Sequence, residues 1–129
     1  MNSECVDPHI AILVVDDSTT TAGILCSLLR NAGFANVELV KDGQSALERL
    51  KITKVSLVLA RWRMFPMSGL QLLHRIRKDD TMSFIRFILV TASAHPQLPE
   101  TVHRLGANGF ILKPFTAETL RVTIKRAFA

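Results

Sequence analysis

The residues Ile10-Ala11-Ile12-Leu13-Val14-Val15-Asp16-Asp17 form an unbroken apolar run that ends in two carboxylates. A continuous apolar run, as opposed to an alternating one, indicates a strand that is buried on both faces of a parallel sheet. Four further apolar runs follow along the chain, at residues 37–40, 55–60, 87–90 and 109–112. We therefore expect five buried strands, of which residues 10–15 form the first.

Amphipathic segments separate these runs. In the first of them, Ser18 or Thr19 can cap a helix that continues to Gly33, with an inward stripe made of Ile24, Leu25, Leu28 and Leu29. Further helices are expected over residues 44–50, 70–76, 98–105 and 116–128. Alternating strands and helices with short connections predict an α/β fold, a doubly wound parallel sheet with right-handed crossovers.

Five polar side chains follow the ends of four expected strands. They are Asp16, Asp17, Arg61, Thr91 and Lys113. In open parallel sheets, ligands bind beyond the carboxyl ends of the strands, next to the point where the strand order reverses. We therefore expect these five side chains to converge at one edge of the sheet.

The segments around these residues resemble the response-regulator receiver domain, the phospho-switch of two-component signalling. The resemblance rests on Val14–Asp17, Trp62, Gly69–Leu73, Val90–Ala92 and Lys113–Thr116. It extends from about Ile10 to Phe128 and is strongest to single-domain, chemotaxis-type receivers. It implies a flavodoxin-like fold, with five strands in the order 2-1-3-4-5 and five helices. It also implies a cis peptide bond at Lys113-Pro114.

In the family that the chain resembles, the third strand ends in the aspartate that accepts the phosphoryl group. Here that strand ends in Arg61. The resemblance assigns the acidic pair of a magnesium site to Asp16 and Asp17, and contacts with phosphoryl oxygens to Thr91 and Lys113. A guanidinium is always protonated and offers no lone pair, so Arg61 cannot be a nucleophile. We expect no phosphorylation at this position and no enzymatic activity.

Formal charges predict that magnesium binding is lost or weak. The usual receiver site contains three carboxylates, one lysine and a divalent ion, whose charges cancel. Here Asp16 and Asp17 are already balanced by Arg61 and Lys113, and Arg63 adds one more cation. A like-charge pair at about 4 Å costs about 4 kcal/mol at an effective dielectric constant near 20. We expect no cofactor, and an ion pair between Arg61 and either Asp16 or Asp17.

The loop after Arg61 carries an apolar cluster, made of Trp62, Met64, Phe65 and Met67. The cluster either packs on the edge of the sheet or forms an exposed contact surface for a partner. The sequence leaves both alternatives open.

Two residues match the switch positions of receivers, Thr91 and Phe110. A phenylalanine has no hydroxyl group to satisfy at the surface, so Phe110 is predicted to turn inward. Arg61 presents only hydrogen-bond donors, so we expect that it does not draw Thr91 inward as a phosphoryl group would.

The resemblance also implies a partner surface on the fourth helix, the fifth strand and the fifth helix. In this chain the surface corresponds to Val102, Arg104, Phe110, Leu120 and Arg121. The implied partner is a signalling protein, namely a histidine kinase, a phosphotransfer protein or the target of a receiver. The alternative for these positions is plain solvated surface.

Composition bounds the class of protein. The chain has 129 residues, 48% of them hydrophobic and 21% charged, which fits one globular receiver-like domain over residues 1–129. Its longest apolar run has six residues, against the roughly 20 that a membrane helix needs. Residues 1–5 lack the features of a signal peptide, so we expect a cytoplasmic protein with no membrane partner. Cys5 and Cys26 fit reduced thiols.

The formal net charge is +5, but the sixteen basic residues are scattered and not interleaved with aromatic side chains. We therefore do not expect nucleic acid as a partner. The sequence predicts a non-phosphorylatable receiver-like protein of two-component signalling that acts by protein–protein contact, as an adaptor, a decoy or a constitutive mimic. Two alternatives stay open: a receiver phosphorylated at Asp16 or Asp17, and a basic nucleic-acid-binding module. A flavin carrier is disfavoured, because Asp16 and Asp17 would repel a flavin phosphate.

Overall fold

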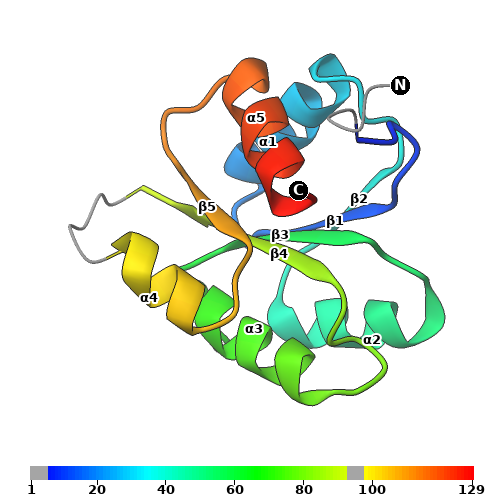
Figure 1. The fold of residues 1–129 in the computed structure, drawn as a ribbon, viewed down its shortest axis with the longest axis vertical. Helices are drawn as coiled ribbons and strands as arrows, with labels where there is room; N and C mark the ends of the chain where they lie inside the picture. Colours follow the sequence, from blue (N-terminus) through cyan, green and yellow to red (C-terminus); the bar gives the residue numbers. More distant parts are fainter. Residues whose placement is uncertain (1–5, 93–97) are drawn as a thin grey trace.

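The structure, a computed structural model, describes residues 6–92 and 98–129. Five parallel strands form one sheet in the order β2-β1-β3-β4-β5 (Figure 1). The strands are β1 (Ile12–Val15), β2 (Val37–Val40), β3 (Leu57–Arg61), β4 (Arg86–Thr91) and β5 (Gly109–Leu112). The helices are α1 (Thr19–Asn31), α2 (Gly43–Ile52), α3 (Gly69–Lys78), α4 (Leu98–Arg104) and α5 (Ala117–Ala127). The fold class and strand order predicted from the sequence are confirmed.

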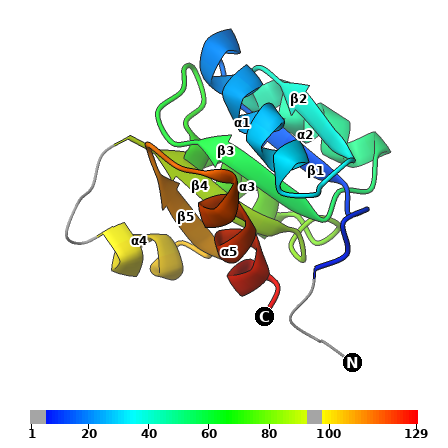
Figure 2. The ribbon, with the colours of Figure 1, turned by 90° about the horizontal axis from the view of Figure 1, so that it is seen from above.

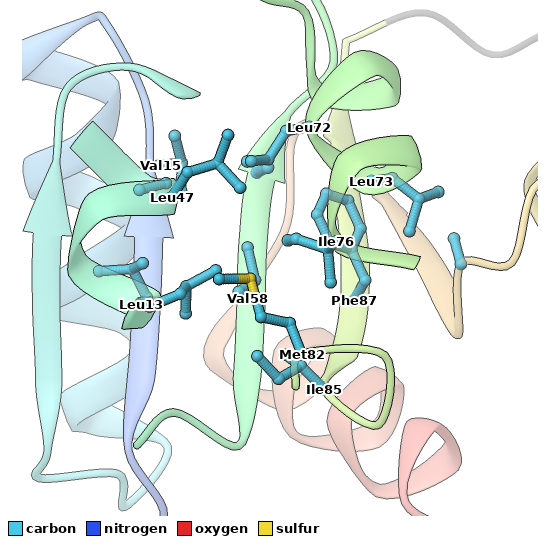
Figure 3. Close-up of a cluster of buried hydrophobic side chains, with 14 of the residues drawn as sticks. Leu13, Val15, Leu47, Val58, Leu72, Leu73, Ile76, Met82, Ile85 and Phe87 are labelled. Atoms are coloured by element: carbon cyan, nitrogen blue, oxygen red, sulfur yellow. The ribbon is translucent and has the colours of Figure 1, made fainter. Parts of the chain in front are cut away.

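Helices cover both faces of the sheet. α1 and α5 pack on one face, whereas α2, α3 and α4 lie on the other (Figures 1 and 2). The larger apolar cluster joins β1, β3 and β4 to α2 and α3, with Leu13, Val58, Leu72 and Phe87 fully buried at its centre (Figure 3). Strands buried on both faces explain why their sequences are continuously apolar.

The parallel register aligns the carboxyl ends of the strands. Val15 is paired with Ala60, Arg61 with Val90, and Thr91 with Leu112. The residues at and just after these strand ends therefore lie next to one another at a single edge of the sheet.

Strand boundaries differ slightly from the prediction. β1 begins at Ile12 and β3 at Leu57, each two residues later than expected, because Ile10 and Val55 lie in the connections that lead into the strands. β3 and β4 instead extend by one residue at their ends, to Arg61 and Thr91. Both side chains are thus held by strand backbone and not by a loop.

The buried face of α1 is rotated relative to the predicted one. Ser18 is its N-cap and accepts a hydrogen bond from the backbone N–H of Thr21. The buried stripe consists of Ala22, Leu25, Cys26 and Leu29. Ile24 was expected to be inward and is 55% exposed, which corrects that prediction. Its position on the helix points to the flank of the stripe, where α5 and the sheet do not cover it.

Three further helices, α2, α3 and α5, begin at polar caps. Asp42 accepts from the backbone N–H of Ser45 at the start of α2, and Thr116 accepts from that of Thr119 at the start of α5. α3 begins with a full capping box, in which Ser68 and Gln71 each accept from the other's backbone N–H. These caps satisfy backbone donors that a helix leaves unpaired at its first turn.

Within residues 6–92 and 98–129, no helix has the length and apolarity needed to cross a lipid bilayer. Cys26 is a buried free thiol, and burial raises its pKa. The other thiol considered above, Cys5, lies outside the described residues.

Candidate functional site

The carboxyl edge of the sheet gathers the predicted residues. Arg61 ends β3, Thr91 ends β4, and Lys113 follows β5. Together with Arg63 they line a hollow of about 60 Å³, which Trp62, Val90 and Ala92 complete. Asp16 and Asp17 follow β1 and are joined to this hollow through Arg61. The predicted convergence of these side chains is confirmed.

Arg61 is paired chiefly with Asp17. Its Nη1 donates a hydrogen bond to Oδ1 of Asp17 at 3.0 Å. The same nitrogen lies 3.6 Å from Oδ1 of Asp16, beyond ordinary hydrogen-bond length. The side chains of Arg61 and Asp17 are 34% and 38% exposed, so solvent screens this ion pair. The ion pair expected from the sequence is confirmed, and Asp17 is its direct acceptor.

Asp16 has a different environment from its neighbour. Its side chain is 1% exposed, and Oδ1 accepts from the backbone N–H of Ser18 at 2.9 Å. Oδ2 is buried and has no hydrogen-bond partner within the described residues. Asp16 therefore fixes the turn between β1 and α1, while Asp17 is the carboxylate that faces solvent.

The backbone around Arg61 is tightly held. The N–H of Trp62 donates to the carbonyl of Val90, and the N–H of Gly69 donates to the carbonyl of Trp62 at 2.8 Å. A Cβ atom at Gly69 would lie 2.5 Å from the carbonyl oxygen of Arg61. Only glycine fits at this close approach, so the first turn of α3 closes directly over the end of β3.

The apolar cluster after Arg61 divides into two parts. Met64 is buried, and Trp62 and Met67 pack against the larger core cluster. Phe65 is 86% exposed. The guanidinium of Arg63 stands 5.7 Å from the centre of the Trp62 ring, a cation–π contact. The packing alternative therefore holds for three of the four residues, whereas Phe65 is exposed and a partner contact there stays a prediction.

Both residues at the expected switch positions, Thr91 and Phe110, are at least half-buried. Thr91 is buried, and Phe110 is half-buried and packs against the larger core cluster. The backbone N–H of Lys113 donates to the carbonyl of Thr91 at 2.9 Å. The peptide bond at Lys113-Pro114 is cis, as expected, and Phe65-Pro66 is cis as well. The inward packing of Phe110 agrees with the prediction.

The expected partner surface needs a correction. Val102 is 3% exposed and Leu120 is fully buried, so neither side chain is available to a partner. Both belong to the core, because they lie on the sheet-facing sides of α4 and α5. Arg104 and Arg121 are exposed, and Arg121 is paired with Glu118 one turn away on α5.

The sequence analysis missed a second hollow beside the site. It has a volume of about 440 Å³ and is lined by Thr21, Ile24, Lys113, Pro114 and Phe115. It brings the exposed side chain of Ile24 next to the lysine of the candidate site. Ile24 lies off the buried stripe formed by Ala22, Leu25 and Leu29, which the spacing of apolar residues alone does not reveal.

Comparison with known proteins identifies the family to which this chain belongs. The family model of the response regulator receiver domain matches residues 12–125. With this match over most of its length, and with the fold and site described above, the chain belongs to the response regulator receiver domain family.

Individual relatives agree with this assignment. The chain is 36% identical to chemotaxis protein CheY-3 of Vibrio cholerae over 123 residues, which cover 95% of each chain. It is 35% identical to chemotaxis protein CheY of Pseudomonas aeruginosa, over 91% of this chain and 94% of the relative. Its structure is similar to that of CheY4 of Vibrio cholerae, with a TM-score of 0.83 and 27% identity over 92% of this chain and 98% of the other. This chain is therefore a receiver related to chemotaxis proteins in two-component signalling.

Proposed function

We propose that this protein is a receiver that is not phosphorylated at the end of β3 and that acts on a signalling partner by contact alone. The observation that carries the proposal is the position of Arg61. Its guanidinium, hydrogen-bonded to Asp17 at 3.0 Å, lies where the family resemblance implies a nucleophilic carboxylate. A protonated guanidinium cannot attack phosphorus. The site therefore has no nucleophile at that position, and we propose no catalytic role for it.

The residues at the pocket do not fit a magnesium ion. Magnesium prefers oxygen ligands in octahedral geometry, and here two carboxylates remain of the three that the resemblance implies. The Nη1 atom of Arg61 lies close to Oδ1 of both Asp17 and Asp16, where a cation would otherwise bind. Residues 6–92 and 98–129 contain no group of three His, Cys, Asp or Glu side chains able to hold a metal. We propose that magnesium binds weakly or not at all.

A magnesium titration followed by the fluorescence of Trp62 tests this part of the proposal. Trp62 is the sole tryptophan of the chain and lines the hollow, so its emission reports on the site. We expect no saturable change for the wild type at physiological concentrations. We expect a saturable change for Arg61→Asp, which restores a third carboxylate. Saturable binding by the wild type that is lost in Asp17→Asn would contradict the charge argument.

The hollow lined by Ile24 and Lys113 supports a contact function. An exposed isoleucine beside the site offers apolar area that a partner helix can bury. The exposed Arg104 and Arg121 offer a second, polar contact region. We propose that the partner is a signalling protein of the same pathway, such as a phosphotransfer protein, a histidine kinase or the target of another receiver.

A pull-down from native lysate, with wild type, Arg61→Asp and Ile24→Ser as baits, tests the contact function. We expect the same partner to be retained by the wild type whether or not acetyl phosphate is present. Ile24→Ser should weaken retention, because the exposed apolar contact is removed, and Ile52→Ser, at an exposed isoleucine outside the hollow, serves as its control. Retention that depends on acetyl phosphate would contradict the proposal.

One alternative, phosphorylation at Asp17, has a specific observation in its favour. Asp17 is 38% exposed and lies at the pocket, so it is accessible to a phosphodonor. Against this, its Oδ1 is engaged by Arg61, and an ion-paired carboxylate is a weaker nucleophile than a free one. Asp16 is a poorer candidate still, because its side chain is 1% exposed.

A further inference from the structure

All charged side chains that line the hollow at the ends of β3 and β4 are cations. Its charged lining side chains are Arg61, Arg63 and Lys113, and its other lining residues are apolar apart from Thr91. Asp16 and Asp17 do not line it, because they contact Arg61 from the side of β1. The hollow thus presents three formal positive charges to whatever enters it.

The nearby carboxylates do not cancel this charge. Together Asp16 and Asp17 carry two negative charges against the three cations, so the whole site keeps a formal charge of +1. Lys113 has no ion-pair partner within the part of the chain that the structure describes, and neither has Arg63. Arg63 is exposed, and its guanidinium stands 5.7 Å from the centre of the Trp62 ring.

Several donors of the hollow are available to a ligand. Of the nitrogens of Arg61, Nη1 is engaged by Asp17, whereas Nε and Nη2 have no acceptor within residues 6–92 and 98–129. Charge-assisted hydrogen bonds from guanidinium groups to an oxyanion are short and strong, and two arginines can bind one such group from two sides.

The size of the hollow limits what it can hold. A volume of about 10–15 Å³ accommodates one water molecule. At about 60 Å³ the hollow has room for a group of four or five heavy atoms, which is the size of one tetrahedral oxyanion. A nucleotide or a flavin would have to leave most of its atoms outside.

We propose that this hollow is a reversible binding site for a phosphate-like oxyanion, held without a covalent bond by Arg61, Arg63 and Lys113. The inference rests on the proposed function, because both depend on an arginine at position 61. A carboxylate at that position would repel the anion. An arginine in place of an aspartate at position 61 thus does more than remove a nucleophile. It turns an acidic pocket that binds a cation into a basic pocket that binds an anion. The anion is either free inorganic phosphate or the phosphate of a small monoester.

A titration with inorganic phosphate, followed by two-dimensional amide NMR, tests the proposal. Sodium chloride keeps the ionic strength constant, and a chloride-only series is run in parallel, because screening alone shifts signals of exposed charges. We expect saturable shifts at residues 61–63 and 113 with phosphate and none with chloride. A parallel series with O-phosphoserine separates the two sources: binding at least as tight as that of phosphate indicates a monoester, and weaker binding indicates the free ion.

Matched variants assign the effect to the hollow. Arg63→Gln and Lys113→Gln should each raise the dissociation constant for phosphate by about tenfold or more, as expected for loss of one charge-assisted hydrogen bond. Arg75→Gln removes the same charge from an exposed position on α3 outside the hollow, and should leave the constant within about twofold. Amide spectra of the three variants without phosphate verify that each is folded.

Three results would overturn the inference. They are shifts that chloride reproduces, shifts that do not saturate, and an equal loss of affinity in Arg75→Gln, which would indicate attraction to the overall positive charge. None of these would affect the proposed function, which depends on the absence of covalent phosphorylation. Covalent phosphorylation of the wild type would instead contradict the proposed function. The phosphate titration would still decide whether the hollow binds the anion.

Discussion

Nη1 of Arg61 donates a hydrogen bond to Oδ1 of Asp17 across 3.0 Å, and this contact joins the end of β3 to the residue pair that follows β1. A carboxylate at position 61 would add a third negative charge beside Asp16 and Asp17, which a cation would have to balance. Here the arginine supplies the positive charge from within the chain. Asp16, Asp17 and Arg61 together carry a formal charge of −1, and Lys113 and Arg63 add two positive charges at the open side of the pocket.

The strength of this contact is measurable. Because both side chains are about one third exposed, we expect a coupling energy of about 0.5–1 kcal/mol, and not the several kcal/mol of a buried pair. The measurement is a double-mutant cycle of chemical denaturation with Arg61→Ala, Asp17→Ala and the double variant. A coupling energy of zero would show that the ion pair does not persist in solution. Magnesium should raise the melting temperature of Arg61→Ala and leave that of the wild type unchanged.

A second arginine, Arg77, bonds several groups of the backbone. We expect its removal to lower the free energy of unfolding by more than the loss of the Arg61–Asp17 ion pair. Arg77, on α3, donates to the backbone carbonyls of Ser83, Ile85 and Gly106 and to Oδ1 of Asn108. It therefore connects α3 to the segments that precede β4 and β5. Arg77→Met keeps the aliphatic stem and leaves partly buried carbonyls without a donor, so we expect a loss of about 1–3 kcal/mol.

The control for this variant is Arg75→Met on the same helix. Arg75 is exposed, and its substitution should change the unfolding free energy by less than about 0.5 kcal/mol. Both values come from urea denaturation. Equal effects of the two variants would mean that the Arg77 contacts contribute no more than a surface charge.

Asp42 predicts a pH dependence of stability. The hydrogen bonds that its carboxylate accepts from the backbone N–H and then the hydroxyl of Ser45 lower its pKa below the ordinary value of 3.8. A lowered pKa in the folded state means that the ionised group contributes stability above pH 3.8, and that this contribution is lost as the pH falls through the lowered value.

Asp42→Asn isolates this effect, because asparagine caps a helix about as well as aspartate but does not titrate. At pH 7 the two proteins should differ by no more than about 0.5 kcal/mol. Between about pH 4 and pH 2 the stability of the wild type should fall more steeply than that of the variant. Parallel acid dependence of the two denaturation curves would show that Asp42 is not the titrating cap.

Because Phe110 is half-buried, we expect the surface formed by α4, β5 and α5 to have a single conformation. If the protein is not phosphorylated, as we propose, no covalent event shifts the balance between two receiver states, and the sequence or a partner sets the state. We expect relaxation-dispersion NMR to detect no millisecond exchange over residues 98–113 in the free wild type. Exchange confined to this segment would mean that both states remain populated.

The five strands were predictable from the sequence because buried parallel strands leave continuous apolar runs, whereas their order came from the family resemblance. The site was predictable because parallel strands align their ends, which brings Arg61, Thr91 and Lys113 together. Helix faces were harder to assign. Ile24 was assigned to the core and is exposed, since a spacing of three and four residues alone does not reveal how wide a stripe the neighbouring helix covers.

On the expected partner surface, residues predicted to be exposed are instead buried. Val102 and Leu120 were carried over from the family surface as contact residues, but both are buried. A surface defined by whole elements includes residues on their inner sides, and only the packing separates the two. The capping box of Ser68 and Gln71 was visible as a spacing of three residues and was overlooked, although it fixes the start of α3 beside the site.

The central claim is that Arg61 abolishes phosphorylation of this receiver. The most direct test is intact-mass spectrometry of the wild type and of Arg61→Asp after incubation with acetyl phosphate and magnesium. The account predicts no added phosphoryl group on the wild type, because its third strand ends in a guanidinium. A wild-type protein that gains one phosphoryl group, mapped by peptide analysis to Asp16 or Asp17, would contradict it.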